Sequence, residues 1–177
     1  MIFTETKLKG AYIVDVDRLA DERGFLARTF CREEFTRHGL NSTLAQTSIS
    51  FNHEKGTLRG MHYQVAPFEE TKVVRCTRGS MYDVIVDLRR DSKTFQRWIS
   101  TELSADNRRM LYIPENFAHG FITLEPQTEI LYYMSEFFHP ESSKGFRWND
   151  PTFNIRWPLA QSVMSERDRT YPDFALG

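Results

Sequence analysis

The sequence predicts an all-β fold, an antiparallel sandwich or barrel with a few short helices. Strand-like segments recur about every ten to fifteen residues from Thr43 onward, few segments have a helical pattern, and turns such as Arg78-Gly79 and Glu125-Pro126 separate the strands. Aromatic residues are plentiful, with 14 Phe, 7 Tyr and 3 Trp, which is typical of strands or of sites that stack on flat ligands. The strands expected in this region are residues 43–50, 57–64, 71–77, 80–88, 96–103, 109–113, 118–124 and 128–134.

Two strands and a helix are expected before Thr43. Residues 11–16 have the composition of a strand, and a turn at residues 21–24 leads into a second strand at residues 25–30. Residues 32–38, followed by Gly39, predict a short helix with a glycine stop.

The segment at residues 80–88 shows the clearest strand alternation. Successive side chains of a strand point to opposite faces, so one face is expected to carry Tyr82, Val84, Val86 and Leu88, and the other Met81, Asp83, Ile85 and Asp87. The tail after Trp148 is richer in Pro and polar residues, and residues 165–170 are expected to form one helical turn. No repeat or linker divides the chain, so residues 1–177 are expected to be a single domain.

Composition excludes several classes of partner. The net charge is −1 with acidic and basic residues interspersed, which gives no reason to expect nucleic acid or an anionic membrane. Cys31 and Cys76 can form at most one disulfide, and residues 1–10 contain three charged side chains without an apolar run. We therefore expect no secretory leader, no membrane span and a location in the reducing cytoplasm.

The segment at residues 56–64 combines a fixed cation with an imidazole. Arg59 and His62 are three residues apart, and strict alternation would send them to opposite faces of a strand. If both serve one cavity, the backbone must bulge or bend, and Gly60 is the residue that allows it. The alternative is that Arg59 caps a carboxylate and His62 is a core histidine.

Polar residues that point into a barrel are costly unless they serve a ligand. The candidates are His62, Lys72, Asp83, His119 and Tyr132. Two structural alternatives stay open: Asp83 can pair with Lys72 only for stability, and Tyr132 can be a core aromatic with a solvated hydroxyl.

A metal site and a cysteine nucleophile are both weakly supported. Metal-binding β-barrels with a His-x-His pair need two histidines on one strand, and here Gln64 occupies the second position. His62 and His119 leave too few ligands for a zinc or iron site, so no metal is expected. Neither cysteine has a recognisable base beside it in the sequence.

Proton transfer next to a carbonyl is the chemistry that these residue types favour. An imidazole exchanges protons near neutral pH, a cation holds developing negative charge on oxygen, and a phenol can return a proton. His62 is expected to take the proton, Lys72 to stabilise the enolate and Tyr132 to reprotonate the opposite face. Asp168 is the carboxylate that can orient His62.

Seven collinear motifs resemble those of the dTDP-4-dehydrorhamnose 3,5-epimerase family. The resemblance runs from about residue 10 to residue 172 and rests on their combination and order. The motifs are Asp21-Glu-Arg23-Gly24-Phe25, Gly56-Thr-Leu-Arg59-Gly-Met-His62-Tyr-Gln64, Lys72-Val-Val-Arg75-Cys76, Tyr82-Asp83-Val-Ile-Val-Asp87-Leu-Arg89, Tyr112-Ile-Pro114 through Ala118-His119-Gly120-Phe121, Leu131-Tyr132, and Trp148-Asn-Asp-Pro151.

The resemblance implies a cupin-like jelly roll, a homodimer whose N-terminal strands extend into the partner's sheet, and no metal or organic cofactor. The implied substrate is a nucleotide-diphospho-4-keto-6-deoxyhexose, whose ketone acidifies the protons at C3 and C5. By resemblance His62 is the base with Asp168 as its partner, Tyr132 is the acid, and Lys72 faces the ketone. The residues that correspond to diphosphate or sugar contacts are Arg23, Arg59, His119 and Arg167.

The chain departs from the family pattern toward the nucleotide end. Arg28 stands in place of a carboxylate, which reverses the local charge and can favour an extra anionic or carbonyl acceptor on the ligand. Gln46 and Ser48 replace a common Gln-x-Asn pattern, Ser143 stands where an acidic residue is common, and Phe138 replaces a tyrosine that packs on the base. The chemistry is therefore better defined than the nucleotide: thymidine is the family default, and a CDP- or GDP-sugar is open.

Two other functions remain as alternatives. A 3,4-ketoisomerase also moves protons around a 4-ketosugar in such a barrel, although the placement of His62 and Tyr132 fits an epimerase better. A non-catalytic sugar-nucleotide-binding module would need no acid and base together, and the presence of both speaks against it.

Overall fold

The computed structural model describes residues 1–175, and residues 176 and 177 of the expected domain lie outside the described part. Its strands are β1 (Ile2–Glu5), β2 (Tyr12–Asp15), β3 (Arg18–Asp21), β4 (Gly24–Ala27), β5 (Gln46–Asn52), β6 (Leu58–Gln64), β7 (Lys72–Arg78), β8 (Ser80–Asp87), β9 (Trp98–Ser104), β10 (Met110–Ile113), β11 (Phe117–Thr123), β12 (Thr128–Met134) and β13 (Ser143–Gly145). Two short helices complete the described elements, α1 (Arg32–Arg37) and α2 (Glu166–Thr170).

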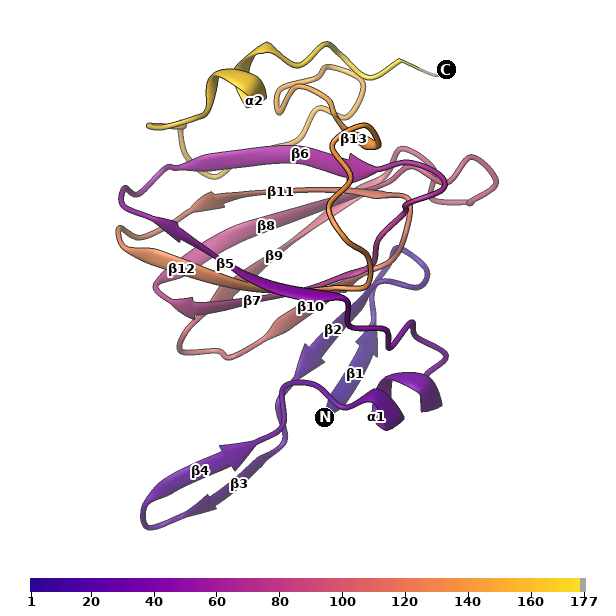
Figure 1. Ribbon diagram of the computed structural model, residues 1–177. Coiled ribbons are helices and arrows are strands. Elements are labelled where there is room, and N and C mark those ends of the chain that lie inside the picture. The colour runs from indigo at the N-terminus through magenta and orange to yellow at the C-terminus, as the bar shows by residue number, and fades with distance from the viewer. Residues whose placement is uncertain (176–177) are drawn as a thin grey trace.

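Two antiparallel sheets face each other across the core (Figure 1). One sheet has the strand order β1-β2-β10-β7-β12-β5 and the other β13-β6-β11-β8-β9. The sequential neighbours β7 and β8 lie in different sheets, so the chain repeatedly crosses between layers, as in a jelly roll. The cupin-like all-β fold expected from the sequence is confirmed.

The core lies between the inner faces of the two sheets. Its main cluster contains Met81 and Ile85 from β8, Val74 from β7 and Ile130 from β12. The opposite face of β8 packs Val84 and other residues against a second cluster, built around Phe146 and Phe153. The alternation expected for residues 80–88 is therefore correct, and both faces of β8 are buried.

The hairpin of β3 and β4 stands away from the barrel (Figure 1). Its turn lies at Glu22 and Arg23, where the Asp21 carboxylate accepts a hydrogen bond of 2.8 Å from the Arg23 amide. The strand expected at residues 25–30 is shorter than predicted and ends at Ala27. Helix α1 follows, and Gly39 ends it with a φ of +69°, as the sequence predicts.

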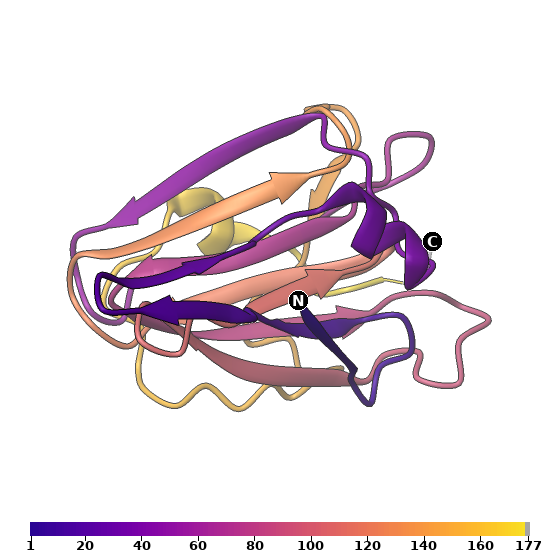
Figure 2. The same cartoon turned by 90° about the horizontal axis from the view of Figure 1, so that it is seen from below.

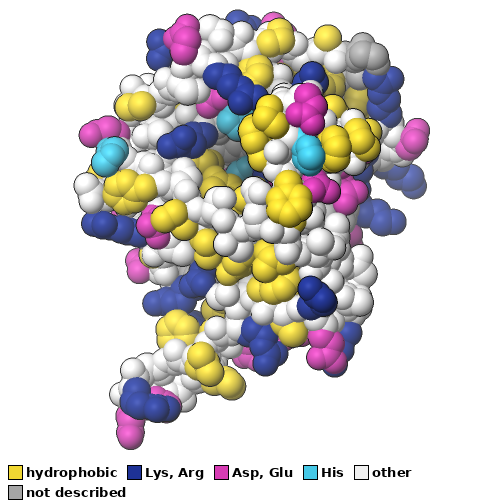
Figure 3. All heavy atoms as spheres, viewed as in Figure 1, with side chains coloured by type: hydrophobic (Ala, Val, Ile, Leu, Met, Phe, Trp, Pro, Cys, Tyr) yellow, Lys and Arg dark blue, Asp and Glu magenta, His cyan; other side chains and the backbone are white. Residues whose placement is uncertain are grey.

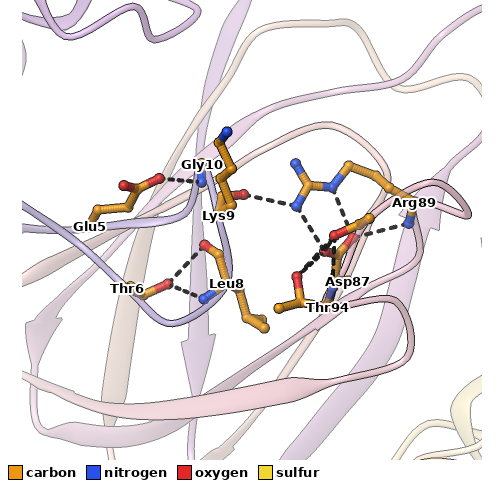
Figure 4. A network of polar contacts seen from close by, with 9 residues as sticks. Glu5, Thr6, Leu8, Lys9, Gly10, Asp87, Arg89 and Thr94 are labelled. Atoms are coloured by element: carbon orange, nitrogen blue, oxygen red, sulfur yellow. Dashed lines mark hydrogen bonds and ion pairs between the residues drawn. The ribbon is translucent and has the colours of Figure 1, made fainter.

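The turn between β1 and β2 is anchored to the loop after β8 (Figure 4). Leu8 inserts into the main core cluster. The Arg89 guanidinium donates a 2.8 Å hydrogen bond to the Lys9 carbonyl and two to the buried carboxylate of Asp87. Thr94 donates a further bond of 2.7 Å to Asp87. This network fixes the N-terminal strands to the barrel.

The C-terminal segment lies against the sheet that contains β6 (Figures 1 and 2). Phe174 packs on Phe146 and Phe153, and its amide donates to the buried carboxylate of Asp150. Ser165 caps α2 by accepting a 3.1 Å bond from the amide of Asp168. This docking brings Asp168 to the barrel.

Candidate active site

A cavity of about 560 Å³ opens between the two sheets. Figure 3 shows its mouth, with histidine atoms inside the hollow and Lys or Arg side chains beside it. Ten residues predicted for the site line it: Gln46, Ser48, Arg59, His62, Lys72, His119, Tyr132, Phe138, Ser143 and Arg167. The sheet of β6 and β11 contributes the two histidines, and the facing sheet contributes Tyr132 and Lys72.

A bulge in β6 brings Arg59 and His62 to the same cavity. On β11, His119 faces His62 and Phe121 faces Arg59, so three steps on β6 match two on β11. The residue that permits this is Gly60, which has a φ of +128° and whose added Cβ would lie 2.5 Å from the Cα of Gly120. The irregularity expected at Gly60 is confirmed.

His62 is held by a carboxylate. Its Nε2 lies 2.6 Å from Oδ1 of Asp168, while Oδ2 of Asp168 accepts a 3.3 Å bond from the Gly60 amide. Burial tends to raise the pKa of Asp168, but the hydrogen bonds from His62, Gly60 and Ser165 together lower it below its usual value. An ionised carboxylate only accepts, so Nε2 of His62 donates in this contact, and Nδ1 is the ring nitrogen that is left to exchange a proton with a ligand.

An aromatic ring packs against the edge of this imidazole. The ring centroids of Tyr171 and His62 are 5.9 Å apart at 61°. Tyr171 lies over Gly145, where a Cβ would come within 2.6 Å of its ring. Gly145 leaves room for the Tyr171 ring, and that ring limits rotation of the His62 imidazole away from Asp168. Sequence reasoning missed Tyr171, which carries no motif of its own.

His119 has its own buried carboxylate. Its Nε2 lies 2.5 Å from Oδ1 of Asp83, which is fully buried on β8. Burial raises the pKa of Asp83 although the contact with His119 opposes this. Asp83 does not line the cavity and reaches it through His119.

The alternative in which Asp83 pairs with Lys72 is wrong. Lys72 lies on β7 and Asp83 on β8, and these strands belong to different sheets. The ammonium of Lys72 pairs instead with Glu70, and both side chains line the cavity. Sequence reasoning missed Glu70, which lies in the loop before β7 and has no motif of its own.

Tyr132 faces His119 from the opposite sheet and lines the same cavity as His62. Its ring centroid lies 6.2 Å from that of His119 at 71°. Burial, and then the negative charge of Asp83, raise the pKa of Tyr132 above its usual value, against a lowering by Arg59. The phenol is therefore protonated at neutral pH and can act as a proton donor.

Cations gather at the mouth of the cavity. The guanidinium of Arg59 is oriented by a 2.8 Å hydrogen bond from its Nε to the buried amide oxygen of Asn52. Arg167 donates a 3.0 Å bond to Ser143 and stacks over Tyr171 at 5.5 Å. With Lys72 deeper inside, these side chains make a cavity suited to an anionic ligand.

Arg23 and Arg28 do not reach this cavity within one chain. Arg23 pairs with Asp21 at the tip of the β3–β4 hairpin. Arg28 follows β4 and pairs at 2.7 Å with Glu34, which also holds the N-terminal ammonium. The charge of Arg28 is thus matched by a neighbouring carboxylate of the same chain.

The fold and the cavity define a class: a cupin-like barrel in which two histidine–carboxylate pairs and a protonated phenol lie around one cavity lined by cations. The chain belongs to the dTDP-4-dehydrorhamnose 3,5-epimerase family, whose model matches residues 5–175. It is 40% identical over 172 residues to the dTDP-4-dehydrorhamnose 3,5-epimerase of Methanothermobacter thermautotrophicus, covering 96% of this chain and 92% of that protein. The family resemblance of the sequence is confirmed, and the protein is an epimerase of sugar nucleotides.

Solved structures agree with this assignment. The dTDP-4-dehydrorhamnose 3,5-epimerase of Bacillus anthracis, solved with TDP and PPi bound, superposes with a TM-score of 0.94 at 37% identity, covering 98% of this chain and 99% of that one. The dTDP-6-deoxy-D-glucose-3,5-epimerase of Legionella pneumophila, in complex with dTDP-4-keto-L-rhamnose, superposes with a TM-score of 0.88 at 34% identity, covering 94% and 89%. No helix in residues 1–175 is long and apolar enough to cross a membrane.

Proposed function

We propose that this protein inverts C3, C5 or both of a nucleotide-diphospho-4-keto-6-deoxyhexose, with dTDP-4-dehydro-6-deoxyglucose as the default substrate. One observation carries the proposal: the imidazole held by Asp168 and the phenol of Tyr132 line the same cavity from opposite sheets. An acid and a base on opposite sides of a carbon are what inversion requires.

In the proposed reaction, Nδ1 of His62 takes the proton from the carbon next to the 4-ketone, and the electrons of the C–H bond move onto the ketone oxygen. Asp168 stabilises the imidazolium that results. Lys72 has three N–H donors, so it can hold the enolate oxygen while it remains paired with Glu70. Tyr132 then delivers its proton to the opposite face, and solvent restores both groups.

The cations at the mouth are proposed to bind the diphosphate. Arg59 and Arg167 present guanidinium groups at the cavity, and arginine matches phosphate oxygens in bidentate geometry. The relatives solved with TDP and PPi, and with dTDP-4-keto-L-rhamnose, support a dTDP-sugar as the ligand. Phe138, whose ring is exposed at the cavity, is proposed to stack on the base.

We also propose that two copies form a homodimer through the N-terminal hairpin. Leu19 and Leu26 of the β3–β4 hairpin are 70% and 73% exposed, and the Arg23 side chain is 85% exposed. In a dimer the apolar residues would be covered and Arg23 and Arg28 could reach the cavity of the second copy. Leu26→Glu should then convert a dimer to a monomer in sedimentation equilibrium, and a wild-type monomer would contradict the proposal. We propose the cytoplasm as the location of the protein; there the thiols of Cys31 and Cys76 would stay reduced.

Solvent exchange tests the function directly. In heavy water with dTDP-4-keto-6-deoxyglucose, the wild-type protein should place deuterium at C3 or C5, read by NMR, and His62→Ala should not. Absence of exchange with dTDP-, CDP- and GDP-linked ketosugars would refute the proposal. A product with the ketone moved to C3 would indicate a 3,4-ketoisomerase, and tight binding without exchange would indicate a binding module.

A further inference from the structure

Gln64 is a buried polar residue for which the proposed reaction has no use. It is the last residue of β6, it lies two residues after His62, and it is 4% exposed. In the sequence it stands where metal-binding barrels place a second histidine. Buried amide groups are costly unless their hydrogen bonds are made, so its bonds should indicate its role.

The carboxamide of Gln64 binds the backbone of two neighbouring loops. Its Oε1 accepts a 2.7 Å hydrogen bond from the amide of His139. Its Nε2 donates a 3.1 Å bond to the carbonyl of Phe137 and a 2.9 Å bond to the carbonyl of Phe68. One side chain thus holds the residue before Phe138 and the residue after it.

Phe138 lies in the segment between β12 and β13, which has no helix or strand of its own. Phe138 lines the cavity and is 56% exposed. A second contact supports the same segment: the rings of His139 and Phe68 stack with centroids 3.5 Å apart at 9°. The loop that contains Phe68 therefore supports the segment that carries Phe138, and Gln64 is hydrogen-bonded to both.

We propose that Gln64 is a positioning residue that fixes the Phe138 ring for stacking on the base of a nucleoside diphosphate. The inference rests on the proposed function, and it implies that Gln64 contributes to the affinity for the nucleoside part of the ligand. Glutamine suits the task because it donates to two carbonyls and accepts from one amide. A glutamate would oppose two carbonyl oxygens with a negative charge, and a leucine would leave three backbone groups unpaired.

Calorimetric titration of four variants with dTDP and with inorganic pyrophosphate tests the inference. Phe138→Ala should weaken dTDP binding about tenfold, since stacking on an aromatic ring contributes that much or more. Gln64→Leu should weaken it to a similar degree, and the double variant should bind no more weakly than Phe138→Ala alone, within about twofold. Pyrophosphate affinity should stay within about twofold of wild type in all of them. Gln161→Leu, an exposed amide substitution away from the cavity, is the matched control.

Amide hydrogen exchange at His139 gives a readout that does not need a ligand. In Gln64→Leu this amide should exchange at least about tenfold faster, because its acceptor is gone. If Gln64→Leu fails to fold, Gln64→Asn replaces it: the shorter amide keeps the polarity and loses the reach.

The outcomes separate the inference from the function on which it rests. A wild type that binds dTDP while the Gln64 variants bind it equally well refutes the inference alone. Equal losses for dTDP and pyrophosphate, or additive losses in the double variant, also refute it, because they indicate a general structural role. A wild type that does not bind dTDP refutes the inference together with the dTDP-sugar substrate of the proposed function.

Discussion

Replacing Asp168 by Asn should slow proton abstraction without removing the base. Asp168 is buried and accepts a 2.6 Å hydrogen bond from Nε2 of His62, and this bond contributes to the lowered pKa of the carboxyl. Asn keeps the shape and can still accept the bond, but it cannot balance the positive charge that His62 gains in the transition state. A hydrogen bond to a charged group contributes about 1.5–3 kcal/mol, so the exchange rate should fall about 10- to 150-fold.

The assay is deuterium incorporation at C3 and C5, measured at saturating and at low substrate concentrations. The loss should appear in kcat more than in KM, because Asp168 acts on the transition state and does not line the cavity. Asp173→Asn is the matched control, since Asp173 pairs with Arg147 in the same C-terminal segment at a half-exposed site. If a folded Asp168→Asn variant exchanges deuterium at a rate within twofold of wild type, Asp168 does not assist proton abstraction by His62 and the reasoning is refuted.

Three further predictions test the fold and the site. Burial tends to raise the pKa of Asp87, but hydrogen bonds from Arg89 and nearby hydroxyls outweigh it and lower the pKa to about 2. The ionised carboxylate therefore stabilises the fold at pH values above its unfolded pKa, and this stabilisation is lost as the pH falls from about 4 to 2. Asp87→Asn should reduce the free energy of urea unfolding by roughly 2 kcal/mol at pH 7 and by much less near pH 2. Gly60→Ala should cost several kcal/mol more than Gly24→Ala in the same assay, because both residues have a φ of +128° but only Gly60 has backbone within 3 Å of the new Cβ. Tyr132→Phe should lower the kcat for product formation about 100-fold or more with little change in KM, and equal losses in kcat and binding would indicate a packing role instead.

Local patterns predicted most of the barrel. Alternation and turn residues located most strands of the two sheets within a few residues, because a strand that is buried on its inner face places an apolar side chain at every second position. The short strands β1, β3 and β13 were missed. Strand β13 contains Ser143, Lys144 and Gly145, which have no strand propensity, and it forms because the backbone of β6 offers it partners.

The site was predicted in part from local sequence and in part from family resemblance. The bulge at Gly60 followed from the spacing of Arg59 and His62. The sequence could not identify the side chain that pairs with Asp83, because Lys72 and His119 are both plausible partners until the sheets are known. Single-chain geometry also leaves Arg23 and Arg28 outside the cavity, since a residue that acts across an interface has no signal in its own neighbourhood.

The central claim is that His62 and Tyr132 act on opposite faces of one sugar carbon. The most direct measurement is deuterium incorporation and product configuration for the single variants of these two residues, read together by NMR. Tyr132→Phe should still exchange the acidic proton, with retention of configuration and without net epimerisation, while His62→Ala should do neither. Exchange that survives in His62→Ala, or inversion at a normal rate in Tyr132→Phe, would contradict the account.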